Sequence, residues 1–337
     1  MILATRFIAG LRAIALAAAC APKDENQGAT SSAAGATNGV ALTGAGATFP
    51  YPIYGKWFSD YATKTGIKIN YQSIGSGGGV RQIIEQTVDF GASDSPMSDE
   101  ELSRAKGGAI LHIPTVLGAD VITYNVPGIA QGLKLTGSVV ADIFLGKIRK
   151  WNDPRIATLN AGITLPSADI LVVHRSDGSG TTYIFTDYLS AVSPEWLRVV
   201  GKGKEVNWPT GIGARGNEGV AGQVKQTPGA IGYVELAYAK QNNLAYASIQ
   251  NAAGSFVAPT IETISAAASA VPATSDYRVS VVNAPGANAY PISSFTWLLV
   301  YRNPADTAKA RILHEFLRYA LTEGTAVARA LGYAPLP

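Results

Sequence analysis

The sequence predicts an α/β fold, because runs typical of strands alternate with runs typical of helices along most of the chain. Residues 67–74 (IKINYQSI) are typical of a strand, and residues 80–88 carry apolar side chains at helical spacing. Further on, a buried strand at 168–173 is followed by a short turn and a helix at 181–190. This alternation predicts sheets that are mainly parallel. The 337 residues are enough for two domains with separate cores.

The first predicted elements lie between residues 50 and 88. An amphipathic aromatic run at 50–66 predicts a helix that ends at Gly66, since glycine often terminates helices. The strand at 67–74 follows, and then a turn at 75–79 (GSGGG) leads into the helix at 80–88.

The next elements are a short strand, a capped helix and a long extended run. The strand is expected at 88–94. Ser98 and Glu101 have the spacing of a capping box, which predicts the start of a helix. Residues 109–125 form an extended apolar run around Pro114.

The C-terminal part predicts one more strand and a helical end. Residues 289–304 are typical of a strand, and residues 307–333 predict one long helix or two short ones. Residues from about 254 to 290 are richer in Ala, Ser, Thr and Pro, and no element is assigned to them.

Residues 1–19 predict a secretory signal peptide. They contain arginines, then a short apolar stretch and small residues, and the stretch is too short for a transmembrane helix. Cys20 ends the segment LAAAC, which is similar to the lipobox of bacterial lipoproteins, although the leucine stands one place early. The alternative is a plain export signal with an incidental cysteine. Residues 20–40 are polar and low in complexity, which predicts a flexible tether. We therefore expect an exported protein that contacts a membrane only through a lipid on Cys20.

Charge and composition argue against several classes of protein. Beyond residue 19 the chain carries 25 basic and 24 acidic side chains, so no broad nucleic-acid surface is expected. A single cysteine allows no internal disulfide. With only three histidines besides, the sequence predicts no metal site of His or Cys ligands, and it predicts no cofactor.

Four junctions that follow predicted strands carry small or hydroxyl-bearing residues just where a helix begins. A helix N-terminus has unpaired N–H groups, glycine lets an anion approach them, and hydroxyls add donors. In open α/β sheets ligands bind beyond the carboxyl ends of the strands, where these junctions lie. Ordinary helix capping explains each junction taken alone. The junctions are 44–49 (GAGATF), 74–79 (IGSGGG), 91–96 (GASDSP) and 175–181 (RSDGSGT).

Two nucleotide-binding motifs do not fit these junctions. The segment GSGGGVRQ has no lysine where a P-loop requires one, and Val80 stands where the dinucleotide fingerprint requires its last glycine.

Two charged residues suggest what kind of anion would bind. Arg175 can donate two parallel hydrogen bonds to an oxyanion, although it could also be a structural partner of Asp177. The two roles are compatible if Asp177 orients the guanidinium. Asp94 should repel an anion unless that anion carries a proton that it can donate. The alternative for Asp94 is an ordinary turn residue.

A hydrolase would need a nucleophile and a base, and the sequence offers no convincing pair. His174, Ser176, Asp177 and Ser179 contain triad residue types, but neighbours on a strand point to opposite faces. If Arg175 faces the ligand, His174 faces away. No G-x-S-x-G elbow is present. The remaining histidines, His112 and His314, stand alone in apolar runs and predict core or surface positions. We therefore predict no catalytic residue and no enzyme.

Several long motifs, in order, resemble the phosphate-binding proteins of bacterial phosphate ABC transporters, which are periplasmic solute receptors. They include LTGAGATFPYPIYGKW, SIGSGGGVRQIIEQTVDFGASDSPMS, DIFLGKIRKWNDPRI, RSDGSGTTYIFTDYL and PGAIGYVELAYA, and the likeness runs from about Val40 to the end. The resemblance implies the two-lobe periplasmic-binding-protein fold of type II, with crossing strands between the lobes. It places lobe I at 41–118 and 290–337, and lobe II at 119–289.

The same resemblance implies a phosphate site and a partner. Asp94 would accept a hydrogen bond from phosphate, and Asp177 would support Arg175. Phosphate would pass to the transmembrane permease of an importer with a cytoplasmic ATPase. The alternatives are a secreted phosphohydrolase with the same cradle, or a receptor for another tetrahedral oxyanion such as sulfate, which Asp94 argues against. The remaining implied contacts are Ala47, Thr48, Phe49 through its backbone, and Ser76 from lobe I, and Arg175, Ser179, Gly180 and Thr181 from lobe II.

Overall fold

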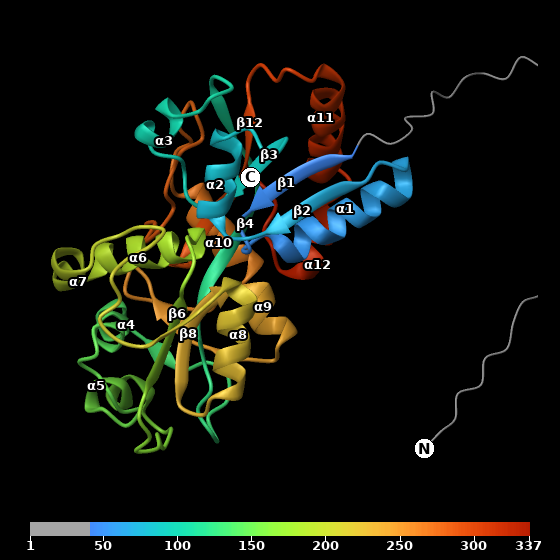
Figure 1. The fold of residues 1–337 in the computed structure, drawn as a ribbon. Coiled ribbons are helices and arrows are strands. Elements are labelled where there is room, and N and C mark those ends of the chain that lie inside the picture. The colour runs from blue at the N-terminus through green and yellow to red at the C-terminus, as the bar shows by residue number, and fades with distance from the viewer. Residues whose placement is uncertain (1–40) are drawn as a thin grey trace, which may run out of the picture. The chain divides into compact units, whose positions relative to one another are not determined.

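The computed structural model describes residues 41–337, and Figure 1 shows how their helices and strands are arranged. The predicted signal peptide (1–19), tether (20–40) and lipidation site (Cys20) lie outside the described residues. Within residues 41–337, no helix combines the length and the apolar content needed to cross a membrane.

A mixed sheet of nine strands runs through the described residues, with the order β2-β1-β3-β12-β4-β8-β6-β7 and with β9 paired to β4. The α/β prediction is confirmed. The prediction of mainly parallel strands is wrong for the middle of the sheet, where β12 and β4 run antiparallel to their neighbours. A strand's side-chain period carries no direction, so the local sequence could not reveal this. The strands are β1 Leu42–Gly46, β2 Ile69–Ser73, β3 Phe90–Ser93, β4 Ile110–Tyr124, β6 Leu171–Arg175, β7 Ile212–Ala214, β8 Ala230–Glu235, β9 Ala245–Tyr246 and β12 Ser293–Tyr301.

Strand β4 is shared by the two halves of this sheet. Residues 110–119 pair with β12, and residues 120–124 pair with β8 (Figure 1). A bulge interrupts the first pairing, because Thr296 pairs with Val116 whereas Trp297 pairs with Pro114. Proline cannot donate to the ladder, and a bulge is a common place for it. The bulge leaves Thr115 unpaired in the ladder, and its hydroxyl donates to the Thr296 carbonyl at 3.1 Å.

The helices agree with most of the predicted positions. Helix α1 ends before Gly66, which has φ 76° as a left-handed cap should. The capping box of Ser98 and Glu101 begins α3 as predicted. The helices are α1 Tyr51–Thr65, α2 Ser76–Ile84, α3 Asp99–Ser103, α4 Gly137–Phe144, α5 Pro154–Ala157, α6 Gly180–Val192, α7 Pro194–Val199, α8 Gly216–Gln226, α9 Leu236–Gln241, α10 Ile261–Ser269, α11 Thr307–Leu321 and α12 Thr325–Leu331.

Three helix predictions need correction or completion. The segment GSGGG is the first turn of α2 and not a separate turn, because α2 begins at Ser76. A Cβ on Gly79 would lie 2.6 Å from the Ala45 carbonyl oxygen, so only glycine at this position lets α2 lie against the sheet. Residues 307–333 form two helices, and α10 lies in the segment where none was predicted. A 3-10 turn at Thr158–Asn160 and a small second sheet of β5 Lys134–Leu135, β10 Ser248–Gln250 and β11 Phe256–Val257 complete the fold.

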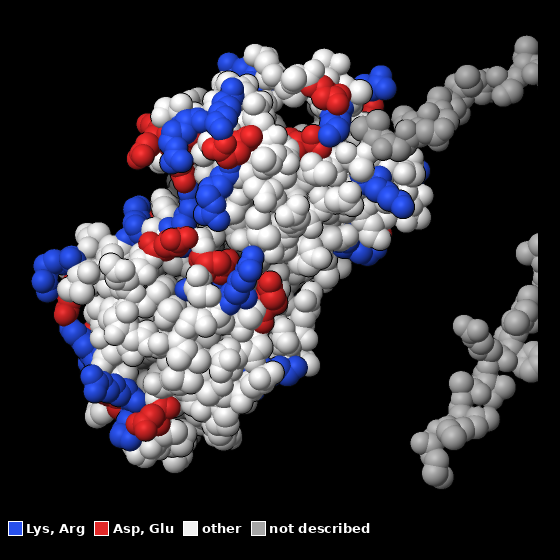
Figure 2. Space-filling view, in the orientation of Figure 1, with Lys and Arg blue, Asp and Glu red and all other residues white. Residues whose placement is uncertain are grey.

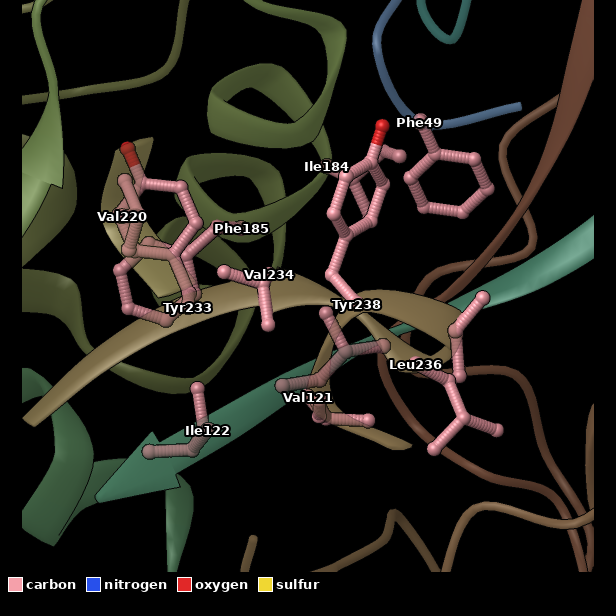
Figure 3. Packing of buried hydrophobic residues seen from close by; sticks show 14 of the residues in the cluster. Phe49, Val121, Ile122, Ile184, Phe185, Val220, Tyr233, Val234, Leu236 and Tyr238 are labelled. Carbon is pink, nitrogen blue, oxygen red and sulfur yellow. The ribbon is translucent and has the colours of Figure 1, made fainter. Parts of the chain in front are cut away.

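Aromatic and aliphatic side chains fill the space between the sheet and the helices around β4 and β8 (Figure 3). The Tyr233 ring stacks on the Phe185 ring with centroids 4.4 Å apart. Tyr238 lies beside Phe49 in Figure 3, and its hydroxyl donates to the Thr48 carbonyl at 2.6 Å. The core therefore fixes the turn that follows β1 against the start of α9.

Candidate anion-binding site

The turns that the sequence singled out converge in the structure. The Ser76 hydroxyl, at the start of α2, lies 3.2 Å from Asp94 Oδ2 and also accepts from the Asp94 N–H. Gly180, at the start of α6, approaches both residues: a Cβ on it would lie 2.5 Å from Ser76 Oγ and 2.6 Å from Asp94 Oδ2. A side chain at position 180 would therefore occupy the space between the turns.

Backbone N–H groups in these turns are available to a ligand. The N–H groups of Phe49, Ser76, Gly180 and Thr181 have no acceptor among residues 41–337. The last three belong to the first turns of α2 and α6, where helical partners are missing and the helix dipole favours an anion. These are the properties of an anion-binding turn.

The turn at Thr48 and Phe49 is held by two tyrosines. Tyr238 donates to the Thr48 carbonyl at 2.6 Å, and Tyr333 donates to the Phe49 carbonyl at 2.7 Å. In a trans peptide the carbonyl and the next N–H point in opposite directions. The Phe49 N–H therefore points away from Tyr238. The Ala47 N–H differs, because it already donates to the Ala92 carbonyl at 3.0 Å, so it is not a free donor.

Arg175 ends β6 and is held in one orientation by Asp177. Its Nε donates to Asp177 Oδ1 at 2.7 Å and its Nη2 to Oδ2 at 2.6 Å, and Nη1 donates to the Thr181 hydroxyl at 3.3 Å. The guanidinium has five N–H donors. Asp177 thus takes the edge of the guanidinium formed by Nε and Nη2, and Thr181 takes one hydrogen of Nη1. One hydrogen on each terminal nitrogen is left for two parallel bonds to an oxyanion.

Asp94 is an acid buried among these donors, with 1% of its surface exposed. The Thr296 hydroxyl donates to its Oδ1 at 2.7 Å, and Ser76 lies against its Oδ2. Burial raises the pKa of Asp94 to about 7, although the Thr296 bond, the charge of Arg175 and the Ser76 bond each lower it. The carboxyl group can therefore change protonation near neutral pH.

Ser179 caps helix α6. Its hydroxyl oxygen accepts from the Thr182 N–H at 3.0 Å, so its hydrogen points elsewhere. Ser179 and Thr181 are both fully buried. The structure thus gathers Thr48, Phe49, Ser76, Asp94, Arg175, Ser179, Gly180 and Thr181 around one place, with Asp177 behind Arg175.

The sequence missed two residues that touch this group. Thr296 comes from β12, and nothing in its local sequence marks it. Asn217, the second residue of α8, donates through Nδ2 to the hydroxyls of Thr48 and Thr181 at 2.8 and 3.0 Å. A signal for Asn217 did exist, because the segment GNEG follows a strand and opens a helix, like the four junctions.

No hydrolytic triad is assembled around His174. Its ring stacks on Trp208 with centroids 4.7 Å apart, and its Nδ1 lies 3.0 Å from the Arg175 carbonyl. The ring therefore faces away from the site, as predicted. His112 is buried and its Nε2 accepts from the Met97 N–H, whereas His314 is exposed, so both agree with their expected core or surface positions. Among residues 41–337 no group of three or more His, Cys, Asp or Glu could hold a metal ion.

Contacts between segments far apart in sequence close the site. The Gly77 N–H donates to the Gly178 carbonyl at 2.9 Å, and Lys204 pairs with Glu101 at 2.5 Å. A hollow of about 480 Å³ reaches Asp94 from the side of α6. Figure 2 shows acidic and basic side chains interspersed on the face in view, so the positive charge available to an anion is local.

Two further acids lie on the paired strands β4 and β8. Asp120 and Glu235 are register partners, and both are fully buried. Both oxygens of Asp120 and Oε1 of Glu235 lack a hydrogen-bond partner among the described residues. Burial raises the pKa of Glu235 to about 8 and that of Asp120 well above its usual range. Like-charged neighbours on a sheet are unfavourable, so these carboxyl groups favour the neutral form.

Comparison with known proteins identifies the family. The model of the PBP superfamily domain matches residues 29–323. The chain is 51% identical over 304 residues to the phosphate-binding protein PstS of Pasteurella multocida, covering 89% of this chain and 88% of the relative. It is 46% identical over 330 residues to the phosphate-binding protein PstS of Xylella fastidiosa, covering 94% and 90%.

Solved structures show the same fold. A phosphate-binding protein from Stenotrophomonas maltophilia gives a TM-score of 0.71 at 23% identity, over 89% of this chain and 91% of that one. An ABC-type phosphate transport receptor from Vibrio cholerae gives 0.58 at 17% identity, over 88% and 100%. The type II two-lobe fold implied by the resemblance is therefore confirmed. The chain belongs to the PBP superfamily and, within it, to the family of the PstS phosphate-binding proteins.

Proposed function

We propose that this protein binds inorganic phosphate outside the cytoplasmic membrane and delivers it to the permease of an ABC-type phosphate importer. The observation that carries the proposal is that Arg175 and Asp94 are both buried at the same place, where the charge of Arg175 acts on Asp94. Arg175 offers two free N–H groups to an oxyanion. Asp94 offers an oxygen acceptor in the same buried place, which suits an anion that still carries a proton. Family membership supports the same function.

Phosphate would be held by donors from both lobes. Thr48, Phe49 and Ser76 would donate from one lobe, and Arg175, Ser179, Gly180 and Thr181 from the other. We infer that lobe I comprises 41–118 and 290–337 and lobe II comprises 119–289. The change of partner along β4 between residues 119 and 120 supports this division. Ala47 would contribute only through its position, since its N–H is engaged.

The functional test is a calorimetric titration, in which phosphate or sulfate is added to protein that was purified without added phosphate. We expect saturable binding of one phosphate per chain and little heat from sulfate. A phosphomonoester hydrolysis assay on the same sample decides against the alternative function, since a phosphohydrolase would release phosphate at a rate proportional to protein concentration. Sulfate binding as tight as phosphate binding would instead favour a general oxyanion receptor.

We propose, further, that the mature protein is anchored through a lipid on Cys20. The cysteine follows an export signal and precedes a polar segment. Stable anchoring takes two or more acyl chains, since one chain binds membranes only marginally. Intact-mass analysis of protein from the membrane fraction should show the added lipid, and Cys20→Ser should move the protein to the soluble exported fraction. An unmodified cysteine on a freely soluble mature form would rule out the anchor.

A further inference from the structure

The Asn217 side chain is fixed in one orientation by a backbone group. It is fully buried, and its Oδ1 accepts from the Glu235 N–H at 2.9 Å. A backbone N–H can only donate, so this bond identifies the oxygen end of the amide. The Nδ2 end therefore faces the hydroxyls of Thr48 and Thr181.

Both threonine hydroxyls accept two hydrogen bonds each. Thr48 Oγ1 accepts from Asn217 Nδ2 at 2.8 Å and from the Asn217 backbone N–H at 3.2 Å. Thr181 Oγ1 accepts from Asn217 Nδ2 at 3.0 Å and from Arg175 Nη1 at 3.3 Å. A hydroxyl has two lone pairs and one hydrogen. Both lone pairs of each oxygen are thus occupied, and each hydroxyl can only donate.

Neither hydroxyl hydrogen has an acceptor among residues 41–337. The two threonines come from different strand-to-helix turns, and one amide sets the direction of both. A partner for two such donors must itself supply lone pairs, which an oxyanion does from every oxygen.

We propose that Asn217 is a positioning residue that directs the hydroxyl hydrogens of Thr48 and Thr181 at the bound anion. This inference rests on the proposed phosphate site. Donors that are already aimed at the ligand need no reorganisation when it binds, which increases affinity. Asn217 acts through the two threonines and does not itself donate to the ligand.

A purely structural role is the competing explanation, because the Oδ1 bond to Glu235 also holds α8 against β8. Asn217→Asp separates the two roles. It keeps an oxygen for the Glu235 N–H but removes both Nδ2 donors, so the hydroxyls can turn toward the new carboxylate. Since that variant also adds charge, Asn217→Ala serves as the uncharged second variant.

The chain offers a matched control in Asn160. It is 5% exposed, its Oδ1 accepts from the Lys134 N–H, and its Nδ2 donates to two carbonyls, those of Lys134 and Ile156. Asn160→Ala removes the same number of bonds away from the site. We expect both alanine variants to lower the melting temperature of phosphate-free protein, but only Asn217→Ala to weaken phosphate binding.

The decisive measurement is a double-mutant cycle, with phosphate affinity determined by calorimetry. Asn217→Ala should weaken binding at least about tenfold, which corresponds to about 1.4 kcal/mol. In a Thr48→Val/Thr181→Val background the same change should have less than about a threefold effect, because no hydroxyls remain to be directed. Equal factors in both backgrounds, or no loss in Asn217→Ala and Asn217→Asp, would overturn the inference. If the double valine variant binds phosphate like the wild type, the proposed site itself is wrong.

Discussion

Replacing Arg175 with alanine is expected to weaken phosphate binding by at least about a hundredfold. The change removes two charge-assisted hydrogen bonds, each worth about 1.5–3 kcal/mol, and about 1.4 kcal/mol corresponds to a factor of ten. It also leaves Asp177, whose side chain is 14% exposed, without the cation that neutralises its charge. Calorimetric titration with phosphate measures the loss.

Arg175→Lys should also bind weakly, because one ammonium group cannot reproduce the fork that serves Asp177 and the anion together. Arg155 provides a matched control. It makes the same Nε and Nη2 contacts with Asp153, both at 2.9 Å, but its side chain is 46% exposed on the surface. Arg155→Ala should leave phosphate affinity unchanged. Wild-type binding by Arg175→Ala would place the site elsewhere.

Asp94→Asn is expected to lower the preference for phosphate over sulfate by about a hundredfold or more. Phosphate near neutral pH carries a P–O–H group, and an ionised Asp94 can accept a hydrogen bond from it. Sulfate has no such proton, so its negative charge would face the negative charge of Asp94. Such a juxtaposition is unfavourable by several kcal/mol, and about 1.4 kcal/mol corresponds to a factor of ten. An asparagine amide can donate to sulfate and still accept from phosphate. Competition of sulfate against labelled phosphate on both proteins measures the ratio, and an unchanged ratio would show that Asp94 does not sense the proton.

The same substitution should raise the stability of the phosphate-free protein at high pH. Burial raises the pKa of Asp94 from 3.8 to about 7, so between these values the folded state binds more protons than the unfolded state. Stability from this group therefore falls as pH rises through that window, and the full penalty is present above about pH 7. Asp94→Asn should thus raise the melting temperature more at pH 8 than at pH 4.5.

A surface acid serves as the control for that comparison. Asp169 has a side chain that is 85% exposed, and Asp169→Asn should shift the melting temperature little at either pH. An equal shift of Asp94→Asn at pH 8 and pH 4.5 would show that the carboxyl is not stabilised in its neutral form.

The sequence predicted the parts of the site that lie on single strand-to-helix junctions. Arg175 and Asp94 could be identified because each stands in a short segment whose residue types already suggest their chemistry. Thr296 could not, because it meets Asp94 only after β12 enters antiparallel beside β3, with Trp297 opposite Ser93. That contact joins residues 202 positions apart and depends on strand order, which side-chain periodicity does not encode.

The start of α2 was predicted wrongly because of its glycines. Its low helix propensity predicted a turn at 75–79, yet Ser76 begins the helix. Tertiary packing decides here, because Gly79 lies against the Ala45 carbonyl and any larger residue would push α2 off the sheet. The energetic reason for a glycine at position 79 is thus a neighbour distant in sequence.

The bonds that close the site also bear on how long a ligand stays. Thr48, Ser76, Asp94, Arg175 and Thr181 are each 3% exposed or less, so a bound ion would be screened from solvent even though the hollow beside α6 reaches Asp94. Its residence time would then follow how often the Gly77–Gly178 and Lys204–Glu101 contacts break together, and not the strength of any single bond to the ion. A membrane partner that breaks these outer contacts would speed release of the ion without touching a ligand-binding group. Affinity in solution and the rate of release at the membrane would then depend on different residues.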